Sequence, residues 1–137
     1  MLSKETEILI INFLQTKIQN LSGIYVYGSY ALNQETSDSD IDLAFLTEDK
    51  ISAVEKWKIQ EELAALLDKD IDLVDVKNAS TVLRKEIVEK GKLIYCADKY
   101  KTDSFEMTSY SMYLDLNESR KHILNDYEEK YGRNPDQ

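Results

Sequence analysis

The stretch GSYALNQETSDSDIDL, residues Gly28 to Leu43, decides which fold and which chemistry this sequence predicts. Ten residues separate the Gly28-Ser29 pair from the Asp40-x-Asp42 pair. Carboxylates at positions i and i+2 of a strand point to the same face, close enough to hold one divalent cation. A glycine lets the backbone approach a ligand closely, and the N–H groups at the start of a following helix bind anions. The stretch therefore predicts a phosphate site beside a metal site, the parts needed to transfer a nucleotidyl group.

The residues on either side of the motif have the pattern of strands. The run 23–27 is short and apolar and ends at Gly28-Ser29, whereas the run 40–46 alternates before it becomes apolar. We therefore expect the Gly-Ser pair where one strand stops and the two acids where another begins. An acidic surface turn is the simplest interpretation of residues 35–38. It does not explain Asp42, because an unpaired charge inside an apolar run is costly.

A calcium loop is another interpretation of the acids, since Asp38, Asp40 and Asp42 occupy the first, third and fifth positions of an EF-hand pattern. The pattern fails at its sixth position, where Leu43 replaces the required glycine. It fails again at its twelfth position, where Asp49 replaces the usual glutamate. A catalytic metal site is therefore the interpretation that we favour.

The motif resembles the signature of the polymerase-beta-like nucleotidyltransferases, G-S-x(10)-D-x-D, and most closely that of its minimal single-domain (MNT) branch. There the pattern commonly reads G-S-x-A-R-G-x(5)-S-D-x-D-L. The matching residues are Gly28, Ser29, Ala31, Ser39, Asp40, Asp42 and Leu43. Leu32 replaces the usual arginine, and Asn33 replaces a glycine whose left-handed backbone an asparagine tolerates. By charge alone, Lys69, Lys77 and Arg84 are the candidates to hold a triphosphate in place of that arginine.

The resemblance extends over about residues 5–97. The stretch 70–76, with the helix and strand that follow it up to Tyr95, is similar to the family's third-acid strand, next helix and closing strand. Within that stretch, Asp72 resembles the third carboxylate of the family's site. Strand alternation puts Asp70 and Asp72 on one face, and pairing favours Asp72 as the residue deeper in the sheet.

The resemblance implies an α/β fold, a small mixed β-sheet flanked by helices, with a C-terminal helix. The catalytic residues and metal ligands that it implies are Asp40, Asp42 and Asp72. The nucleotide-binding residues are Gly28, Ser29 and Ser39. Hard oxygen ligands without a nearby His or Cys favour Mg²⁺, or Mn²⁺, and such ions stabilise the charge that develops during transfer from ATP. Asp72 would complete the metal shell or accept the proton of the incoming hydroxyl.

Apolar residues at spacings of three and four predict helices over residues 3–21, 51–67 and 81–90. In the second of these helices, the apolar positions expected on the packed face are Val54, Trp57, Leu63, Leu66 and Leu67. A chain of 137 residues with 42% hydrophobic content is expected to form one domain, with no room for a second substrate-binding domain.

The predicted organisation is a nucleotidyltransferase core of residues 1–97, a helical extension of residues 98–131 for packing and partner binding, and a polar tail of residues 132–137. An apolar stripe follows the extension at spacings of seven and four. Its members are Phe105, Met112, Leu116, Ile123 and Tyr127. Part of the stripe is expected to cover the sheet and the rest to project outward. His122, the single histidine, is interpreted as a surface residue.

The charge balance separates the classes of substrate. The net charge is −9, from 26 acids and 17 bases, whereas a protein that binds long nucleic acids presents a basic surface. A protein partner with a basic face fits better. The single Cys96 excludes an internal disulfide and fits a reducing cytosol, and neither a signal peptide nor a membrane-spanning run is visible. We expect a cytoplasmic protein that does not act at the membrane. The sequence leaves open whether the chain forms a homo-oligomer.

Within the MNT branch, a compact domain with a C-terminal helix looks like the antitoxins of type VII-like HEPN/MNT toxin–antitoxin pairs. The resemblance implies a protein adenylyltransferase that transfers AMP from ATP to a tyrosine of a helical HEPN-domain ribonuclease toxin (HepT-like). A bulky anion at a site that must bind RNA phosphates would block it by charge and volume. Two alternatives stay open: a small-molecule (aminoglycoside-type) nucleotidyltransferase, and a non-catalytic antitoxin that acts by binding.

Overall fold

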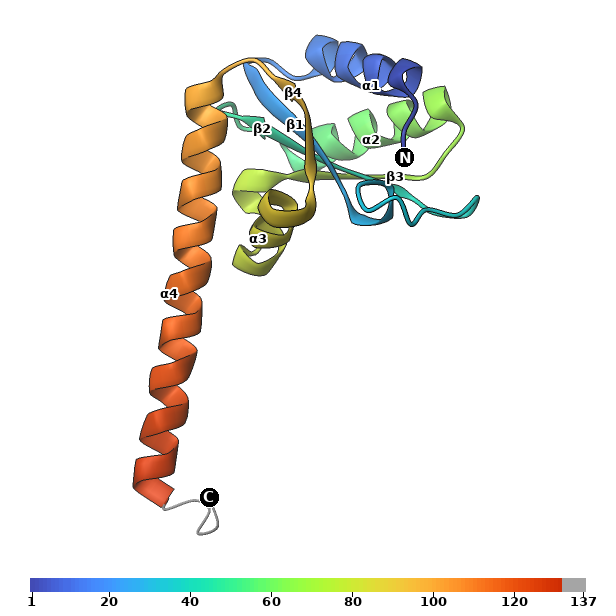
Figure 1. The fold of residues 1–137 in the computed structure, drawn as a ribbon. Coiled ribbons are helices and arrows are strands. Elements are labelled where there is room, and N and C mark those ends of the chain that lie inside the picture. The colour runs from blue at the N-terminus through green and yellow to red at the C-terminus, as the bar shows by residue number, and fades with distance from the viewer. Residues whose placement is uncertain (132–137) are drawn as a thin grey trace.

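The computed structural model describes residues 1–131, and from residue 119 it describes only the backbone of the last helix. Helices and strands alternate along the chain (Figure 1). In order they are α1 (Lys4–Lys17), β1 (Leu21–Tyr27), the 3₁₀ turn η1 (Gly28–Tyr30), β2 (Ile41–Thr47), α2 (Ala53–Leu67), β3 (Ile71–Asp75), the 3₁₀ turn η2 (Val76–Asn78), α3 (Thr81–Lys90), β4 (Lys92–Cys96) and α4 (Lys99–Tyr131).

The four strands form one mixed sheet in the order β3-β2-β1-β4. β1 pairs antiparallel with both β2 and β4, whereas β2 and β3 run parallel. Parallel neighbours need a crossover, and α2 supplies it between β2 and β3. The predicted α/β fold with a small mixed sheet is confirmed.

Each face of the sheet has its own core. On one face, α1 and α2 cover a cluster that includes Leu43, Phe45 and Leu73. On the other face, α3 and the start of α4 cover a smaller cluster that includes Tyr25 and Ala44. Figure 1 shows these two layers of helices on opposite sides of the sheet. Because both faces are covered, every residue of β1 is buried, as is usual for a central strand.

Serine side chains start the first three helices. Ser3, Ser52 and Ser80 each accept a hydrogen bond from a backbone N–H in the first turn of α1, α2 and α3, a standard N-cap. The helix predicted over residues 81–90 is confirmed. The helix predicted over residues 3–21 is too long, because Asn20 takes a left-handed conformation (φ 53°) that turns the chain from α1 into β1.

The predicted packed face of α2 is right for Leu63 and Leu67 and wrong for the other three residues, of which Leu66 is 52% exposed. Val54 and Trp57, expected on the packed face, are 64% and 58% exposed. Ile59 and Leu63 are the buried residues of this helix. Helical spacing therefore located the helix but identified its packed side only in part, since apolar residues occupy both sides of α2.

The first turns of α4 belong to the core, whereas the rest of the helix leaves the body (Figure 1). Thr102, Phe105 and Ser109 are buried. Arg84 Nε on α3 donates to Ser109 Oγ at 3.0 Å. Of the predicted stripe, Phe105 packs in the core as expected for its covering part. Met112 is 39% exposed and Leu116 is half-buried, and the side chains of His122, Ile123 and Tyr127 lie outside the described part of the chain.

Within the described residues, no helix combines the length and the apolar character that crossing a bilayer requires.

Candidate active site

Three side chains lie in a row across one edge of the sheet. Tyr27 on β1 pairs with Asp42 on β2, and Asp42 pairs with Asp72 on β3. Paired residues on neighbouring strands point to the same face, here the face that α3 covers in part. Asp40 immediately precedes β2 at this same edge. The structure therefore brings the three predicted acids to the place where β1 ends and β2 and β3 begin.

Asp42 has the most strained electrostatic position of these acids. It is half-buried, whereas Asp40 and Asp72 are exposed. Burial, as the largest cause, and the negative charges of Asp72, Asp40 and Glu86 together raise the pKa of the Asp42 carboxyl from 3.8 to about 6. Like charges held together disfavour one another's ionisation, and a divalent cation would relieve that repulsion.

The acids do not form a closed metal shell. Among the described residues, no group of three or more His, Cys, Asp or Glu side chains is gathered tightly enough to hold a metal ion. Mg²⁺ commonly takes only one or two protein carboxylates and completes its octahedron with water and substrate phosphates. The donor chemistry of the carboxylate row fits magnesium, provided that a nucleotide supplies the remaining oxygen ligands.

Gly28 sits directly against Asp42. Its backbone has a left-handed φ of 69°, which favours glycine. A Cβ atom at this position would lie 2.2 Å from Asp42 Oδ2, far inside van der Waals contact. The glycine of the predicted phosphate loop therefore lets the loop and the central carboxylate occupy adjoining space.

Backbone hydrogen bonds between residues close in sequence hold the loop after Gly28. The N–H groups of Ala31 and Leu32 donate to the Gly28 carbonyl at 3.1 and 3.2 Å, and the N–H of Gln34 donates to the carbonyl of Ser29 at 2.9 Å. Asn33 adopts φ 57°. The prediction that Asn33 substitutes for a left-handed glycine is thereby confirmed, and the turn survives the departure from the family's pattern.

The two predicted phosphate-binding serines occupy different settings. Ser29 is half-buried in the η1 turn beside Gly28. Ser39 closes a turn instead: its Oγ accepts from Thr36 N–H at 2.8 Å, and its own N–H donates to the Thr36 carbonyl at 3.1 Å. Ser39 thus shapes the chain just before Asp40.

A cavity of about 630 Å³ lies beside Ser39, between the loop before β2 and the end of α2. Its lining includes Glu61, Asp68 and Lys69 but neither Asp42 nor Asp72. The cavity therefore does not contain the carboxylate row, and its volume gives no reason to place the chemistry there.

Two residues of the site had no signal in the motif. Tyr27 is buried beside Asp42, and burial together with the charges of Asp72, Asp42 and Glu86 raises the pKa of its hydroxyl. Glu86 approaches from α3 and acts on both Tyr27 and Asp42 through its charge. The strand register identifies Tyr27, because it is the residue opposite Asp42. Only tertiary packing identifies Glu86.

The three basic residues expected by charge to hold a triphosphate either have another hydrogen-bond partner or lie away from the carboxylate row. Arg84 is held between α3 and α4 by its bond to Ser109. Lys69 donates at 3.4 Å to a backbone carbonyl of the loop before β2. Lys77 follows the end of β3 that is opposite to Asp72. Lys69 is the candidate beside the loop, since its ammonium lies 6.0 Å from the ring centre of Tyr30 in η1.

The chain matches the family model described as "Polymerase beta, Nucleotidyltransferase" over residues 9–100. It belongs to this nucleotidyltransferase family, and the family predicted from the Gly-Ser and Asp-x-Asp motif is confirmed.

The chain is similar to a curated adenylyltransferase and to chains in toxin–antitoxin crystal structures. Protein adenylyltransferase MntA of Shewanella oneidensis is 37% identical over 117 residues, 85% of this chain and 84% of the relative. A toxin–antitoxin crystal structure with AMP-PNP matches with a TM-score of 0.81 and 36% identity, over 88% of this chain and 97% of that chain. The complex of tri-AMPylated S. oneidensis HEPN toxin with MNT antitoxin matches with a TM-score of 0.77 and 35% identity, over 90% of this chain and 97% of that chain.

Proposed function

We propose that this chain is a protein adenylyltransferase that acts as an antitoxin, moving AMP from ATP onto a tyrosine of a HEPN ribonuclease toxin. The observation that carries the proposal is the contact between Gly28 and Asp42 beside the register pair of Asp42 and Asp72. It joins a phosphate loop to a carboxylate pair, as nucleotidyl transfer requires. The similarity to MntA and to AMPylated toxin complexes supports the choice of acceptor.

The carboxylate row would hold Mg²⁺, or Mn²⁺, through Asp40, Asp42 and Asp72. When bound, the ion neutralises charge that develops on the phosphate oxygens. The half-buried Asp42 lies directly against Gly28, so this ligand adjoins the loop that would hold the phosphates. Backbone N–H groups of η1 and the hydroxyl of Ser29 would donate to phosphate oxygens of the bound nucleotide.

Asp72 is the exposed member of the register pair, so it faces an incoming acceptor. In the proposed step its carboxylate takes the proton of the tyrosine hydroxyl. The phenol oxygen then forms a bond to the α-phosphorus while the bond to the bridging oxygen of pyrophosphate breaks, and pyrophosphate leaves. The toxin tyrosine gains AMP, and the proton stays on Asp72 until solvent removes it.

The charge of the chain suits this acceptor. A ribonuclease needs a basic surface to bind RNA phosphates, and a protein of net charge −9 attracts such a surface. Addition of AMP then places a bulky anion near the RNA site, which opposes RNA by charge and volume. The reaction consumes ATP, so we place it in the cytoplasm.

The test is a transfer assay with a purified HEPN ribonuclease toxin from the same organism, labelled ATP and Mg²⁺. We expect label on the toxin with the wild type and a loss of more than about a hundredfold with Asp42→Asn, since even outer-shell partners of a metal cost 10- to 100-fold. Asp38→Asn, which neutralises an exposed acid of the same loop, is the matched control and keeps its activity. A toxin that stays unlabelled with the wild type contradicts the proposal, and so does an Asp42→Asn variant that neutralises the toxin in cells.

A further inference from the structure

A second apolar face runs along α4 on the side turned away from the body. Tyr100, Met107 and Leu114 recur every seven residues, and Tyr110 lies three residues after Met107, so the four share one helix face. Tyr100 is 80% exposed, Met107 72%, Leu114 54% and Tyr110 45%. We call these four residues the outer seam. It differs from the stripe predicted from sequence, whose first member, Phe105, is buried.

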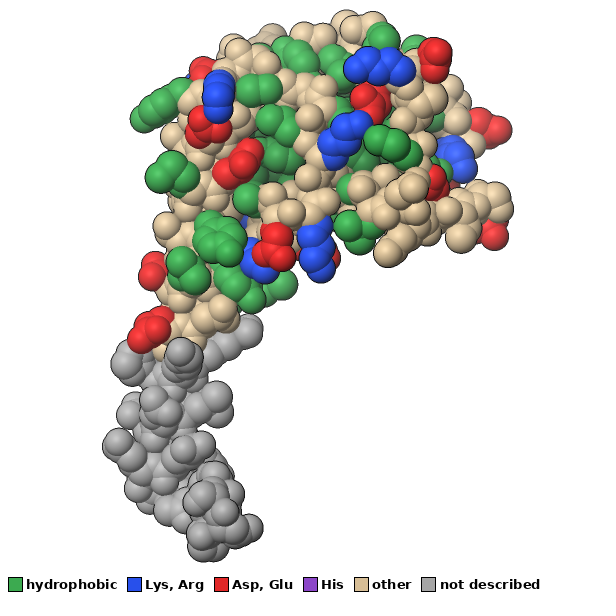
Figure 2. All heavy atoms as spheres, in the orientation of Figure 1, with side chains coloured by type: hydrophobic (Ala, Val, Ile, Leu, Met, Phe, Trp, Pro, Cys, Tyr) green, Lys and Arg blue, Asp and Glu red, His purple; other side chains and the backbone are tan. Residues whose placement is uncertain are grey.

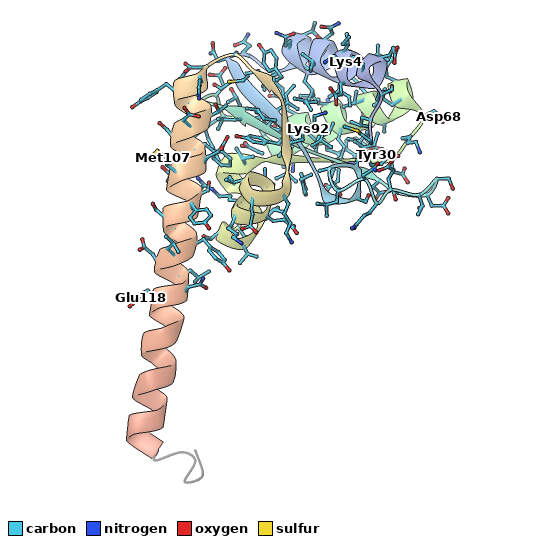
Figure 3. The ribbon with its side chains drawn as sticks, viewed as in Figure 1. Lys4, Tyr30, Asp68, Lys92, Met107 and Glu118 are labelled. Carbon is cyan, nitrogen blue, oxygen red and sulfur yellow. The ribbon has the colours of Figure 1, made fainter. Side chains whose placement is uncertain are left out.

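The outer seam points into solvent. Figure 3 shows Met107 directed outward from α4, and Figure 2 shows hydrophobic side chains protruding along the same edge of the molecule. Leu114 follows Tyr100 by fourteen residues, which is about 21 Å of helix at 1.5 Å per residue. Contiguous apolar side chains that face water mark interaction sites, and a seam with heptad spacing fits one partner helix.

Acidic residues surround the seam. From residue 102 to residue 118 the helix has no Lys or Arg. Its charged residues in this stretch are Asp103, which pairs with Lys99, Glu106, which is bonded to Tyr25 on the covered side, and Asp115 and Glu118 toward the end of the seam. Lys99 and Lys101 stand at the start of the helix, where each pairs with an acid. In the sequence, the next bases after Glu118 are Arg120 and Lys121. Two copies that met through this face would bring like charges together, whereas a partner helix flanked by Lys or Arg would complement it.

We propose that the outer seam binds an amphipathic helix of the toxin, with its apolar face on the seam and its flanking bases beside the acids of α4. The proposal rests on the proposed function, since it takes its partner, a ribonuclease with a basic surface, from there. The covered side of α4 is fixed to the body by Arg84 with Ser109 and by the Tyr25 hydroxyl, which donates to Glu106 at 2.7 Å. Tyr100, Met107 and Leu114 are on the opposite side of α4, whereas Tyr110 lies at the edge of the seam toward Lys85 of α3. Docking and transfer are therefore separable properties of the chain.

The test measures binding of the purified toxin to the full chain by calorimetry without ATP, so that no transfer takes place. We expect the double variant Met107→Glu with Leu114→Glu to bind at least about tenfold more weakly than the wild type, the size of effect that loss of central apolar contacts produces. The matched control is Val54→Glu with Leu66→Glu, two apolar residues of α2 that are 64% and 52% exposed. It should bind within about twofold of the wild type.

Thermal melts of each variant report whether it is folded. If the variant Met107→Glu with Leu114→Glu has a lower melting temperature than the wild type, Met107→Ser with Leu114→Ser tests the same contact without adding charge to an acidic helix. The proposal is overturned if the seam variants bind the toxin with the same affinity as the control variant. A wild-type dimer in sedimentation that a seam variant converts to monomer also overturns it, because the seam then holds a second copy. A toxin can also bind tightly through the seam and yet receive no AMP from labelled ATP. That result contradicts the proposed function but supports the proposed docking surface.

Discussion

Asp42 and Asp72 are partners in the parallel register of β2 and β3, so their side chains leave the sheet side by side. Asp70 is different: it precedes β3, and its carbonyl accepts from Ile41 N–H at 2.9 Å. Exchanging either acid for Asn removes one charge and little volume. We expect Asp72→Asn to lower AMP transfer by more than about a hundredfold and Asp70→Asn to lower it by less than about threefold, because only Asp72 shares the row with Asp42. The rate of AMP transfer from labelled ATP is measured for both variants. Equal losses of rate in the two variants would contradict the role of the pair formed by Asp42 and Asp72.

Gly28→Ala should damage both stability and transfer. The added methyl would meet Asp42 Oδ2 at 2.2 Å, and alanine at φ 69° is strained. We expect the steric contact and the backbone strain together to lower the free energy of unfolding, measured in denaturant, by about 1–3 kcal/mol. The rate of AMP transfer should also fall. Asn33→Gly is the matched control in the same loop, since glycine accepts the φ of 57° there without strain. A Gly28→Ala protein as stable as the wild type would show that the loop moves away from Asp42 at no cost.

Metal binding should depend on pH through Asp42. Its carboxyl has a pKa of about 6 in the metal-free protein, so a cation must displace a proton below that pH. We expect Mn²⁺ affinity, followed by electron paramagnetic resonance, to be constant above pH 7 and to fall by about tenfold per pH unit well below pH 6. The Asp40→Asn variant should move the decline to lower pH, because it removes one of the charges that raise the pKa of Asp42. Affinity that is flat from pH 5 to 8 would contradict this.

The same carboxyl predicts a pH effect on the stability of the metal-free protein. The folded pKa of about 6 lies above the ordinary value of 3.8, so folding favours the protonated acid. This contribution is fully present below pH 3.8 and is lost as the pH rises through 6. At pH 7.5 we therefore expect Asp42→Asn to melt at a higher temperature than the wild type in the presence of a chelator. At pH 4 the difference should shrink, and a wild type that is more stable at both pH values would contradict the assignment.

The contact between α3 and α4 should contribute more than a surface ion pair. Arg84→Ala removes the 3.0 Å bond to the buried Ser109 hydroxyl and the guanidinium 5.1 Å from the Phe105 ring centre. We expect it to lower the free energy of unfolding by about 1–3 kcal/mol. Lys99→Ala removes an exposed pair with Asp103 and should cost less than about 1 kcal/mol. Equal costs for the two variants in urea would show that α4 is not anchored by Arg84.

The sequence predicted the parts of the site that depend on local patterns. The Gly28 turn, the left-handed Asn33 and the alternation that selects Asp72 are each set by a few neighbouring residues, and the structure has the turn, the conformation and the register expected. The site roles of Ser29, Ser39 and the three acids remain predictions. Features that arise from tertiary packing were not visible. The packed side of α2 was predicted only in part, because Trp57 is apolar yet exposed whereas Leu63 is buried, and Glu86 reaches the site only because α3 folds back over the sheet.

The burial of Thr102, Phe105 and Ser109 makes one helix serve two purposes, because its first turns complete the core and its outer side is the surface proposed for docking. A protease that cut α4 beyond Glu118 would shorten it and leave the buried contacts intact. A cut near Phe105 would uncover Tyr25 and release the whole domain to degradation. We therefore expect partner recognition and catalysis to disappear together during turnover in the cell, with no long-lived fragment that keeps only the catalytic half.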